Sequence, residues 1–245
     1  MPLHSRAKLV KVRHAAALFA ALITIASPAT QGARPMMTDD ARLVDPQACQ
    51  VESWVRTNKG SREHWALPAC NFTGNLELTL GGAQTQSAAG SDTTDVILQG
   101  KTLFKPLETN GYGIGLAVGY AAHPAANTDR RLLGDPYFYV PMSFSLRNDD
   151  LVIHSNLGAL RSREKQQVKP TWGLGAEWRM NQQLFLIGEA FGQSDGRPSA
   201  QAGVRFWLVP NHVQIDATYG NRLESSDNRR WFSLGLRLIS LPFLK

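Results

Sequence analysis

The sequence predicts an all-β fold, a single antiparallel β-barrel that crosses a membrane. Two observations support this prediction: a leader typical of exported proteins, and short segments in which apolar residues alternate with polar or small ones. Alternation with a period of two gives a strand one apolar face, because successive side chains point to opposite sides. A set of such strands can cross a bilayer only as a closed barrel, in which every backbone polar group is paired.

The first 32 residues have the composition of a cleaved signal peptide. Four basic residues precede an apolar run from Ala15 to Ala26, and the segment holds no acidic residue. Small residues follow the run and predict cleavage between residues 29 and 33. The apolar run is too short to cross a membrane as a helix. We therefore expect the mature chain to be exported rather than anchored by its leader.

The formal net charge of +6 at pH 7 comes mostly from this leader. Loss of its four basic residues leaves about +2 on the mature chain, so the charge gives no support for nucleic-acid binding. Beyond the leader, no apolar stretch approaches the roughly 18 residues that a transmembrane helix needs. The length of the mature chain fits one all-β domain.

Residues 33–47 are expected to form an irregular N-terminal arm in the periplasm, because they contain Pro35, Pro46 and the acidic pair Asp39-Asp40. Residues 48–245 are expected to form the barrel, with about twelve strands and ten as the alternative count. The expected strands are residues 48–56, 63–72, 76–83, 94–104, 111–122, 136–146, 150–161, 169–180, 183–193, 200–209, 212–220 and 229–241.

The connections between these strands are expected to alternate in length. Outer-membrane barrels have short turns on the periplasmic side and longer loops outside. Gly, Asn, Asp and Pro occur in both groups of connections and supply turn geometry. The first longer loop is expected over Thr57–Arg62. An even number of strands then places both ends of the barrel on the short-turn side.

Cys49 and Cys70 are the two cysteines, and an even pair in an exported chain indicates a disulfide. The two residues are equidistant from the centre of the first hairpin, beside Gly60. Directly opposed residues of an antiparallel pair have Cβ atoms about as far apart as a disulfide requires. Two independent thiols are the alternative.

The polar faces of the expected strands define a candidate lumen. A Lys or Arg facing lipid at mid-membrane costs about 2–4 kcal/mol, so charged side chains are expected to point inward. Hairpin register places Arg205 opposite Asp216, and the next two strands to the N-terminal side bring Glu177, Arg179 and Glu189 into one neighbourhood. The candidate lumen residues are Glu52, Glu77, Lys101, His154, Asn156, Glu177, Arg179, Glu189, Arg205, Asp216 and Arg237.

Two interpretations of this lumen remain open. Its charges form a salt-bridge network that fills and stabilises a narrow barrel, or they line a wet channel that binds or filters a solute. The glycine-rich inner face of residues 111–119 carries almost no side chains. It leaves room for water or a ligand, or for a plug or the N-terminal arm to pack closely.

No catalytic, metal or cofactor site is expected, so the chain is not predicted to be an enzyme. His154 and Ser155 are neighbours on one strand and point to opposite faces, which prevents joint action on a substrate. His154 and Asn156 share a face without an identifiable serine partner. The spacing of His, Cys and carboxylate residues matches no zinc site, and no phosphate-binding glycine loop occurs.

The mature chain opens with Arg34–Ala41 and Val51–Trp54, and closes with Gln201–Phe206, Asp216–Gly220 and Trp231–Leu236. These runs resemble outer-membrane barrel proteins linked to the meta-pathway of phenol degradation, a transporter-like family. The resemblance spans most of the mature chain. It implies a transporter-like barrel whose solutes include hydrophobic or aromatic molecules.

The expected function is a passive channel or uptake protein for small molecules in the outer membrane of a Gram-negative bacterium. The expected partners are outer-membrane lipid, a small-molecule solute and the barrel-assembly machinery, with no nucleic acid. Such barrels commonly end on an aromatic residue that this machinery reads, a role that Phe243 would take here. A structural or surface-binding barrel without transport and a membrane-embedded hydrolase are the alternatives.

Overall fold

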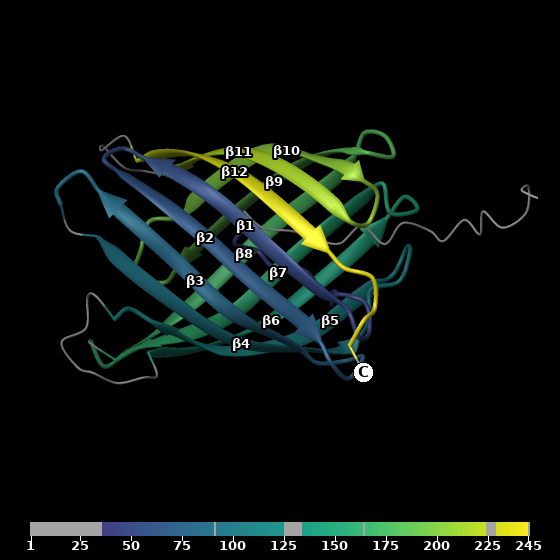
Figure 1. Ribbon diagram of the computed structural model, residues 1–245, viewed down its shortest axis with the longest axis horizontal. Coiled ribbons are helices and arrows are strands. Elements are labelled where there is room, and N and C mark those ends of the chain that lie inside the picture. The colour runs from purple at the N-terminus through teal and green to yellow at the C-terminus, as the bar shows by residue number, and fades with distance from the viewer. Residues whose placement is uncertain (1–35, 91, 125–133, 164, 224–228, 245) are drawn as a thin grey trace, which may run out of the picture.

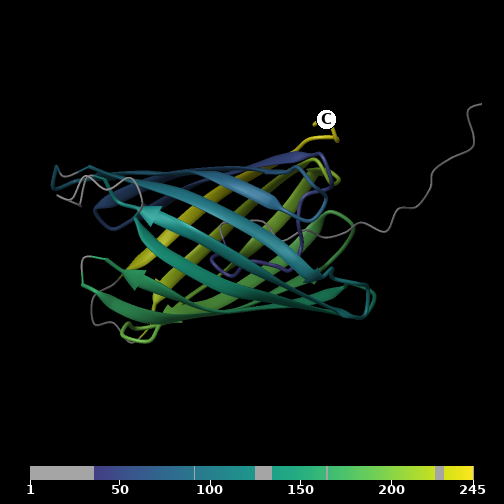
Figure 2. The same ribbon diagram turned by 90° about the horizontal axis from the view of Figure 1, so that it is seen from below.

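Twelve strands form a closed antiparallel barrel in the computed structural model of this chain (Figures 1 and 2). The structure describes residues 36–90, 92–124, 134–163, 165–223 and 229–244, so the predicted signal peptide lies outside the described residues. In chain order the strands are β1 (Cys49–Asn58), β2 (Ser61–Asn71), β3 (Glu77–Ser87), β4 (Thr93–Lys105), β5 (Tyr112–Ala122), β6 (Asp135–Leu146), β7 (Leu151–Ser162), β8 (Gln167–Arg179), β9 (Leu184–Gln193), β10 (Ser199–Val209), β11 (Val213–Arg222) and β12 (Arg230–Ile239).

The ring closes where β1 pairs with β12, over a ladder that runs from Gln50–Ile239 to Asn58–Trp231. Each of the remaining ten strands pairs with the strand before it and the strand after it in the chain. Each of the twelve strands therefore has a partner on both sides, which leaves no open sheet edge in this ring. The predicted twelve-strand antiparallel barrel is confirmed, and the alternative count of ten is wrong.

The first hairpin differs from its prediction. β1 and β2 continue to Asn58 and Ser61, so the loop expected over Thr57–Arg62 contracts to a turn of Lys59 and Gly60. Gly60 adopts a φ of 86°, a left-handed conformation that glycine reaches without steric cost. The residues on either side of the turn are polar, and for this reason a loop was predicted there. The two strands nevertheless stay paired beyond their apolar stretches.

The outer face of the barrel is apolar and the inner face is polar or small. On β8, Leu174 and Trp178 are exposed on the outside, whereas Gly173, Gly175 and Glu177 are buried on the inside. β3, β5, β11 and β12 follow the same alternation. Within the described ranges, no helix is long and apolar enough to cross a membrane.

A disulfide joins Cys49, the first residue of β1, to Cys70 near the end of β2. The two residues are directly opposed in the register of the β1–β2 pair, with Cα atoms 4.0 Å apart. The predicted disulfide is confirmed. Its position pins the start of β1, which is where the N-terminal arm joins the barrel wall.

The exposed apolar face generates a prediction that compares two positions on the same strand. Leu174 lies near the middle of β8 and is 54% exposed, whereas Val168 lies near its first residue and is 62% exposed. Because a charge at mid-membrane loses its hydration, Leu174→Arg is expected to lower the free energy of unfolding in lipid vesicles by about 2–4 kcal/mol. Val168→Arg is expected to cost about 0–1 kcal/mol. Equal, small costs for both variants in urea titrations would contradict a lipid-facing outer wall.

Candidate functional site

The segment before β1 lies inside the barrel. Figure 2 shows it within the ring of strands, and its contacts come from opposite parts of the wall. Met36, Ala41 and Val44 are buried. The segment is irregular, but its expected location in the periplasm is corrected here for residues 36–44, which we call the lumenal arm. The arm is inside because the inward-facing polar groups of the wall meet its backbone and its carboxylates.

The lumenal arm occupies the half of the barrel at the β2–β3, β4–β5, β6–β7, β8–β9 and β10–β11 connections, which we call the short-turn half. At one end, the Val44 N–H donates to Glu77 Oε2 at 2.9 Å, and Glu77 is the first residue of β3. Further along, Thr38 lies against Gly173, close to the middle of β8. Met36 then contacts Gly175, which is nearer the short-turn end again. The arm therefore enters from the short-turn end, reaches about mid-barrel and turns back.

Wall side chains hold the arm through its main chain. Both carboxylate oxygens of Glu189 accept hydrogen bonds, from the N–H groups of Met37 and Thr38, each at 2.7 Å. The Ala41 N–H donates to Ser143 Oγ at 2.8 Å. Buried backbone donors without partners are costly, so these wall acceptors allow an irregular segment to remain inside the barrel.

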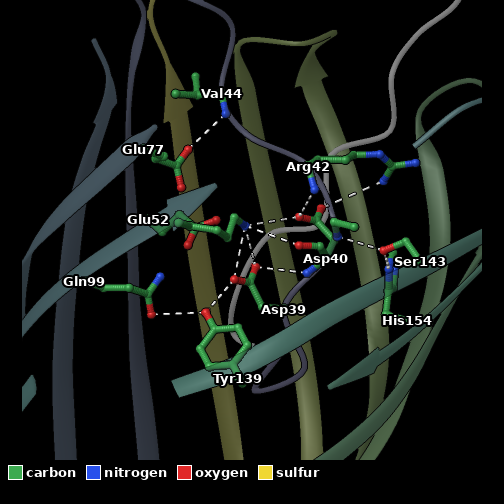
Figure 3. Close-up of polar contacts among 12 residues, drawn as sticks. Asp39, Asp40, Arg42, Val44, Glu52, Glu77, Gln99, Tyr139, Ser143 and His154 are labelled. Atoms are coloured by element: carbon green, nitrogen blue, oxygen red, sulfur yellow. Dashed lines mark hydrogen bonds and ion pairs between the residues drawn. The ribbon is translucent and has the colours of Figure 1, made fainter. Parts of the chain in front are cut away.

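The acidic pair of the arm, Asp39 and Asp40 (Figure 3), meets one buried lysine, Lys101. Lys101 Nζ lies 3.0 and 3.1 Å from the two carboxylate oxygens of Asp39 and 3.5 Å from Asp40 Oδ1. The hydroxyl of Tyr139 donates to the Asp39 carboxylate at 2.6 Å. Lys101 is only 4% exposed. Loss of one partner from a buried ion pair costs about 3–5 kcal/mol, so this cluster is a main anchor of the arm.

Two glycines of β8 make room for the arm. A Cβ atom placed on Gly173 would lie 2.6 Å from Thr38 Oγ1, and one on Gly175 would lie 2.6 Å from Met36 Cε. Both distances are below van der Waals contact, so a larger residue at Gly173 would push against Thr38, and one at Gly175 would require the end of the Met36 side chain to move. The arm thus packs against the small-residue face of β8 that holds Gly173 and Gly175, and not against the glycine row of β5.

A small cavity lies between the arm and the wall. It has a volume of about 20 Å³ and is lined by charged residues of both, including Asp39, Arg42, Glu52, Glu77 and Arg237. A single water needs roughly 10–15 Å³ by this measure. The cavity is therefore of water size, and in this conformation it gives no passage to a larger solute.

A series of polar contacts links four strands behind the arm, β6, β7, β8 and β10. Ser143 Oγ lies 2.8 Å from His154 Nδ1, His154 Nε2 lies 3.5 Å from Glu177 Oε1, and Glu177 is paired with Arg205. Sequence reasoning missed Ser143 as the serine partner of His154. Their facing positions on β6 and β7, seen in the strand register, are the signal that could have found it. Ser143 is fully buried and accepts the Ala41 N–H, so this series of contacts fastens the arm.

The predicted lumen residues share the inward-facing side of their strands, and all but one of them are buried. Arg205 is opposite Asp216 in the β10–β11 register, as the hairpin predicted, and its guanidinium also reaches Met36 Sδ at 4.0 Å. Arg237 donates to Gln50 Oε1 at 2.8 Å. The buried candidates are Glu52, Glu77, Lys101, His154, Asn156, Glu177, Glu189, Arg205, Asp216 and Arg237.

Arg179 is the exception. Its guanidinium donates to Asp150 Oδ1 at 2.8 and 2.6 Å and to the carbonyl of Asn148 at 2.8 Å, in the turn between β6 and β7. Three consecutive residues of that turn have positive φ angles, which is a strained backbone that needs outside support. Arg179 supplies this support at the barrel rim. Arg179 is on the same face of β8 as Glu177, two residues away, but its hydrogen bonds run to Asp150 and Asn148 rather than to Glu177 or Glu189.

Aromatic side chains line the opposite half of the lumen, towards the longer loops. The indole rings of Trp54 and Trp65 are stacked with centroids 5.2 Å apart. The guanidinium carbon of Arg56 lies 5.3 Å from the ring centroid of Trp231, which is in turn 6.4 Å from Phe191. This cation–π and aromatic cluster gives the loop-end half an apolar and cationic lining that the arm does not fill.

Charged pairs also occur at the loop end. A hydrogen bond to the Asp95 carboxylate, at 2.6 Å, raises the pKa of His123. The ammonium of Lys169 lies 2.7 Å from the carboxylate of Asp195 and lowers the pKa of that exposed group. Within the described part of the chain, no group of three or more His, Cys, Asp or Glu side chains is placed to hold a metal ion.

The arm anchor generates a prediction that a pair of tyrosines can test. Tyr139→Phe removes a hydrogen bond to a charged carboxylate, which is worth about 1.5–3 kcal/mol, so the arm should open more often. We expect hydrogen exchange at the Thr38 and Ala41 amides to be about 10- to 100-fold faster. Tyr137→Phe is the control, because its hydroxyl donates to the neutral side chain of Gln99 at 3.0 Å. Equal acceleration in the two variants would contradict the anchoring role.

Similar solved structures support the barrel fold. The KdgM porin in complex with disordered oligogalacturonate matches with a TM-score of 0.55 at 11% identity, covering 78% of this chain and 99% of that chain. The NanC porin matches with a TM-score of 0.57 at 9% identity, covering 80% and 100%. The COG4313 outer membrane channel from Pseudomonas putida F1 matches with a TM-score of 0.52 at 13% identity, covering 78% and 93%. At these identities the likeness establishes the fold alone.

The sequence comparisons identify the family to which this chain belongs. No curated protein shows significant sequence similarity to this chain. A family model matches residues 18–239, which is nearly the whole chain, and its description does not mention phenol degradation. This chain therefore belongs to the family described as uncharacterised conserved protein UCP029691.

Proposed function

We propose that this chain is an outer-membrane channel for small solutes, and that its lumenal arm closes the short-turn half. The observation that carries the proposal is the charged interior of a ring whose outer face is apolar. Buried ion pairs are often no more stabilising than apolar residues of similar volume, so stability alone gives no reason for such a lining. A route for water and polar solutes does require it.

The proposed location is the outer membrane of a Gram-negative bacterium. The predicted signal peptide supports export, and the apolar outer face of the ring supports insertion into lipid. Insertion would be carried out by the barrel-assembly machinery. Phe243 is exposed beyond β12, and its N–H donates to the carbonyl of Gln47 at 2.9 Å. An accessible aromatic residue near this end supports recognition by that machinery.

The proposed solutes are small molecules, including aromatic ones. The inward cluster of Trp54, Trp65, Arg56 and Trp231 supports this, because stacked rings and a guanidinium bind flat or aromatic faces. The structure of KdgM, a barrel of similar fold, contains oligogalacturonate. We carry over from that neighbour only the passage of a small solute, and we add no enzymatic role to this chain.

A barrel without transport is the alternative, and the nature of the arm contacts favours the channel. The arm is held by hydrogen bonds and ion pairs, such as those of Lys101 and Glu189, and these contacts can separate and reform. Among the described residues, its backbone-to-backbone hydrogen bonds with the wall begin at Gln47, whose N–H donates to the carbonyl of Asn71 at 2.8 Å. A plug attached in this way can leave the lumen while the ring of strands stays closed.

The test is the conductance of the full-length protein refolded into planar lipid bilayers. In the wild type we expect small, rare openings, because the arm occupies the short-turn half. The Asp39→Asn/Asp40→Asn double variant removes both carboxylates that bind Lys101. Its arm should leave more often, so the open probability should rise by about tenfold or more, which corresponds to about 1.4 kcal/mol.

Asp45→Asn is the matched control, because Asp45 follows the lumenal arm and is exposed. Its conductance should equal that of the wild type. Folding of each variant is checked by the gel migration of the protein before and after boiling. If both the wild type and the double variant fold correctly and neither conducts, the channel proposal is refuted. The structural barrel without transport is then the function that is left.

A further inference from the structure

The wall of the lumen recognises features that any peptide carries. Glu189 accepts two consecutive main-chain N–H groups of the arm, those of Met37 and Thr38. The amide of Asn156, when oriented to satisfy both atoms, accepts from the Asp39 N–H at 2.7 Å and donates to the Asp39 carbonyl at 2.8 Å. This paired contact repeats the pattern between two strands, in which one amide group binds another.

One contact in the same place depends on the side chain. Lys101 and Tyr139 converge on the carboxylate of Asp39, and Lys101 also reaches Asp40. An ammonium and a hydroxyl directed at one carboxylate form charge-assisted hydrogen bonds, which are stronger than those to a neutral amide. The wall therefore distinguishes an acidic residue from its amide while holding the main chain on both sides of it.

The strands that carry these wall residues do not depend on the arm for their positions. Glu189, Asn156, Lys101 and Tyr139 lie on β9, β7, β4 and β6, and each strand is paired on both sides within the ring. Gly173 keeps the space beside them clear of side chains. The site that the arm fills would remain when the arm leaves.

We infer that the short-turn half of the lumen is a binding site for short acidic peptides, and that the lumenal arm is its built-in competitor. The inference rests on the proposed channel function, because a peptide can enter only when the arm has left. A tethered segment competes at an effective concentration in the millimolar range. Peptides should therefore bind weakly to the wild type and better to a variant whose arm is weakened.

The experiment uses full-length Asp39→Asn/Asp40→Asn protein in detergent micelles and measures binding by calorimetry. The probes are acetyl-Met-Thr-Asp-Asp-Ala-amide, its Asn-Asn counterpart, and succinate. We expect the acidic peptide to bind about tenfold more tightly than the Asn-Asn peptide, because Lys101 and Tyr139 meet a charge. Succinate should also bind about tenfold more weakly than the acidic peptide, because it lacks the main-chain amides that Glu189 and Asn156 hold.

Variants in the same background identify the site. Lys101→Met should abolish the preference for the acidic peptide, and Tyr139→Phe should reduce it and provides a second test if the first variant does not fold. Lys169→Met is the matched control, because Lys169 pairs with Asp195 at the loop end and should leave the preference unchanged. Equal binding of the two peptides, a preference that survives Lys101→Met, or succinate binding as tight as the acidic peptide would overturn the inference. Absence of binding in a protein that conducts would refute the peptide site alone, whereas absence of conductance would refute the channel.

Discussion

The pairing of β1 with β12 is the constraint on which the rest of the structure depends. Once the first and last strands pair, every residue of the twelve strands lies either on the outside or in the lumen. The apolar residues then have only the outer face, where lipid can cover them, and the charges have only the lumen. The disulfide between Cys49 and Cys70 secures the start of β1. It therefore holds both the strand that closes the ring and the point where the arm joins that strand.

Enclosed charges require partners, and the lumenal arm supplies part of them. Lys101 would face mainly Glu77 across the β3–β4 pair without the arm; with the arm it gains the carboxylates of Asp39 and Asp40. Glu189 gains two main-chain donors. The interaction is mutual, because an irregular segment without secondary structure could not bury its backbone unless the wall offered acceptors. A salt-bridge network and a solute-binding lumen are therefore two uses of the same side chains, and the arm determines which of them is available.

The period of two in the sequence was sufficient to predict the strands, their number, the disulfide and the facing of residues such as Arg205 and Asp216, because these depend on neighbouring strands. It could not predict contacts that cross the lumen. The contact of Ser143 with His154 is different, because it joins neighbouring strands; it was missed because the sequence left the β6–β7 register uncertain by a few residues. The arm has no periodicity at all, and its acidic pair gave no indication of Lys101 as its partner. Only the closed ring brings these residues together.

The most direct test is the distance between the Lys101 ammonium and the Asp39 carboxyl carbon in the full-length protein reconstituted in lipid. Solid-state NMR measures it by dipolar recoupling between nitrogen-15 and carbon-13 labels, without any substitution. The nitrogen lies 3.0 and 3.1 Å from the two carboxylate oxygens. We therefore predict strong dephasing of the carboxyl carbon-13 signal by the Lys101 nitrogen-15, as expected for an ion pair in direct contact. A folded barrel in which this pair shows no dephasing would place the arm outside the lumen and contradict the account.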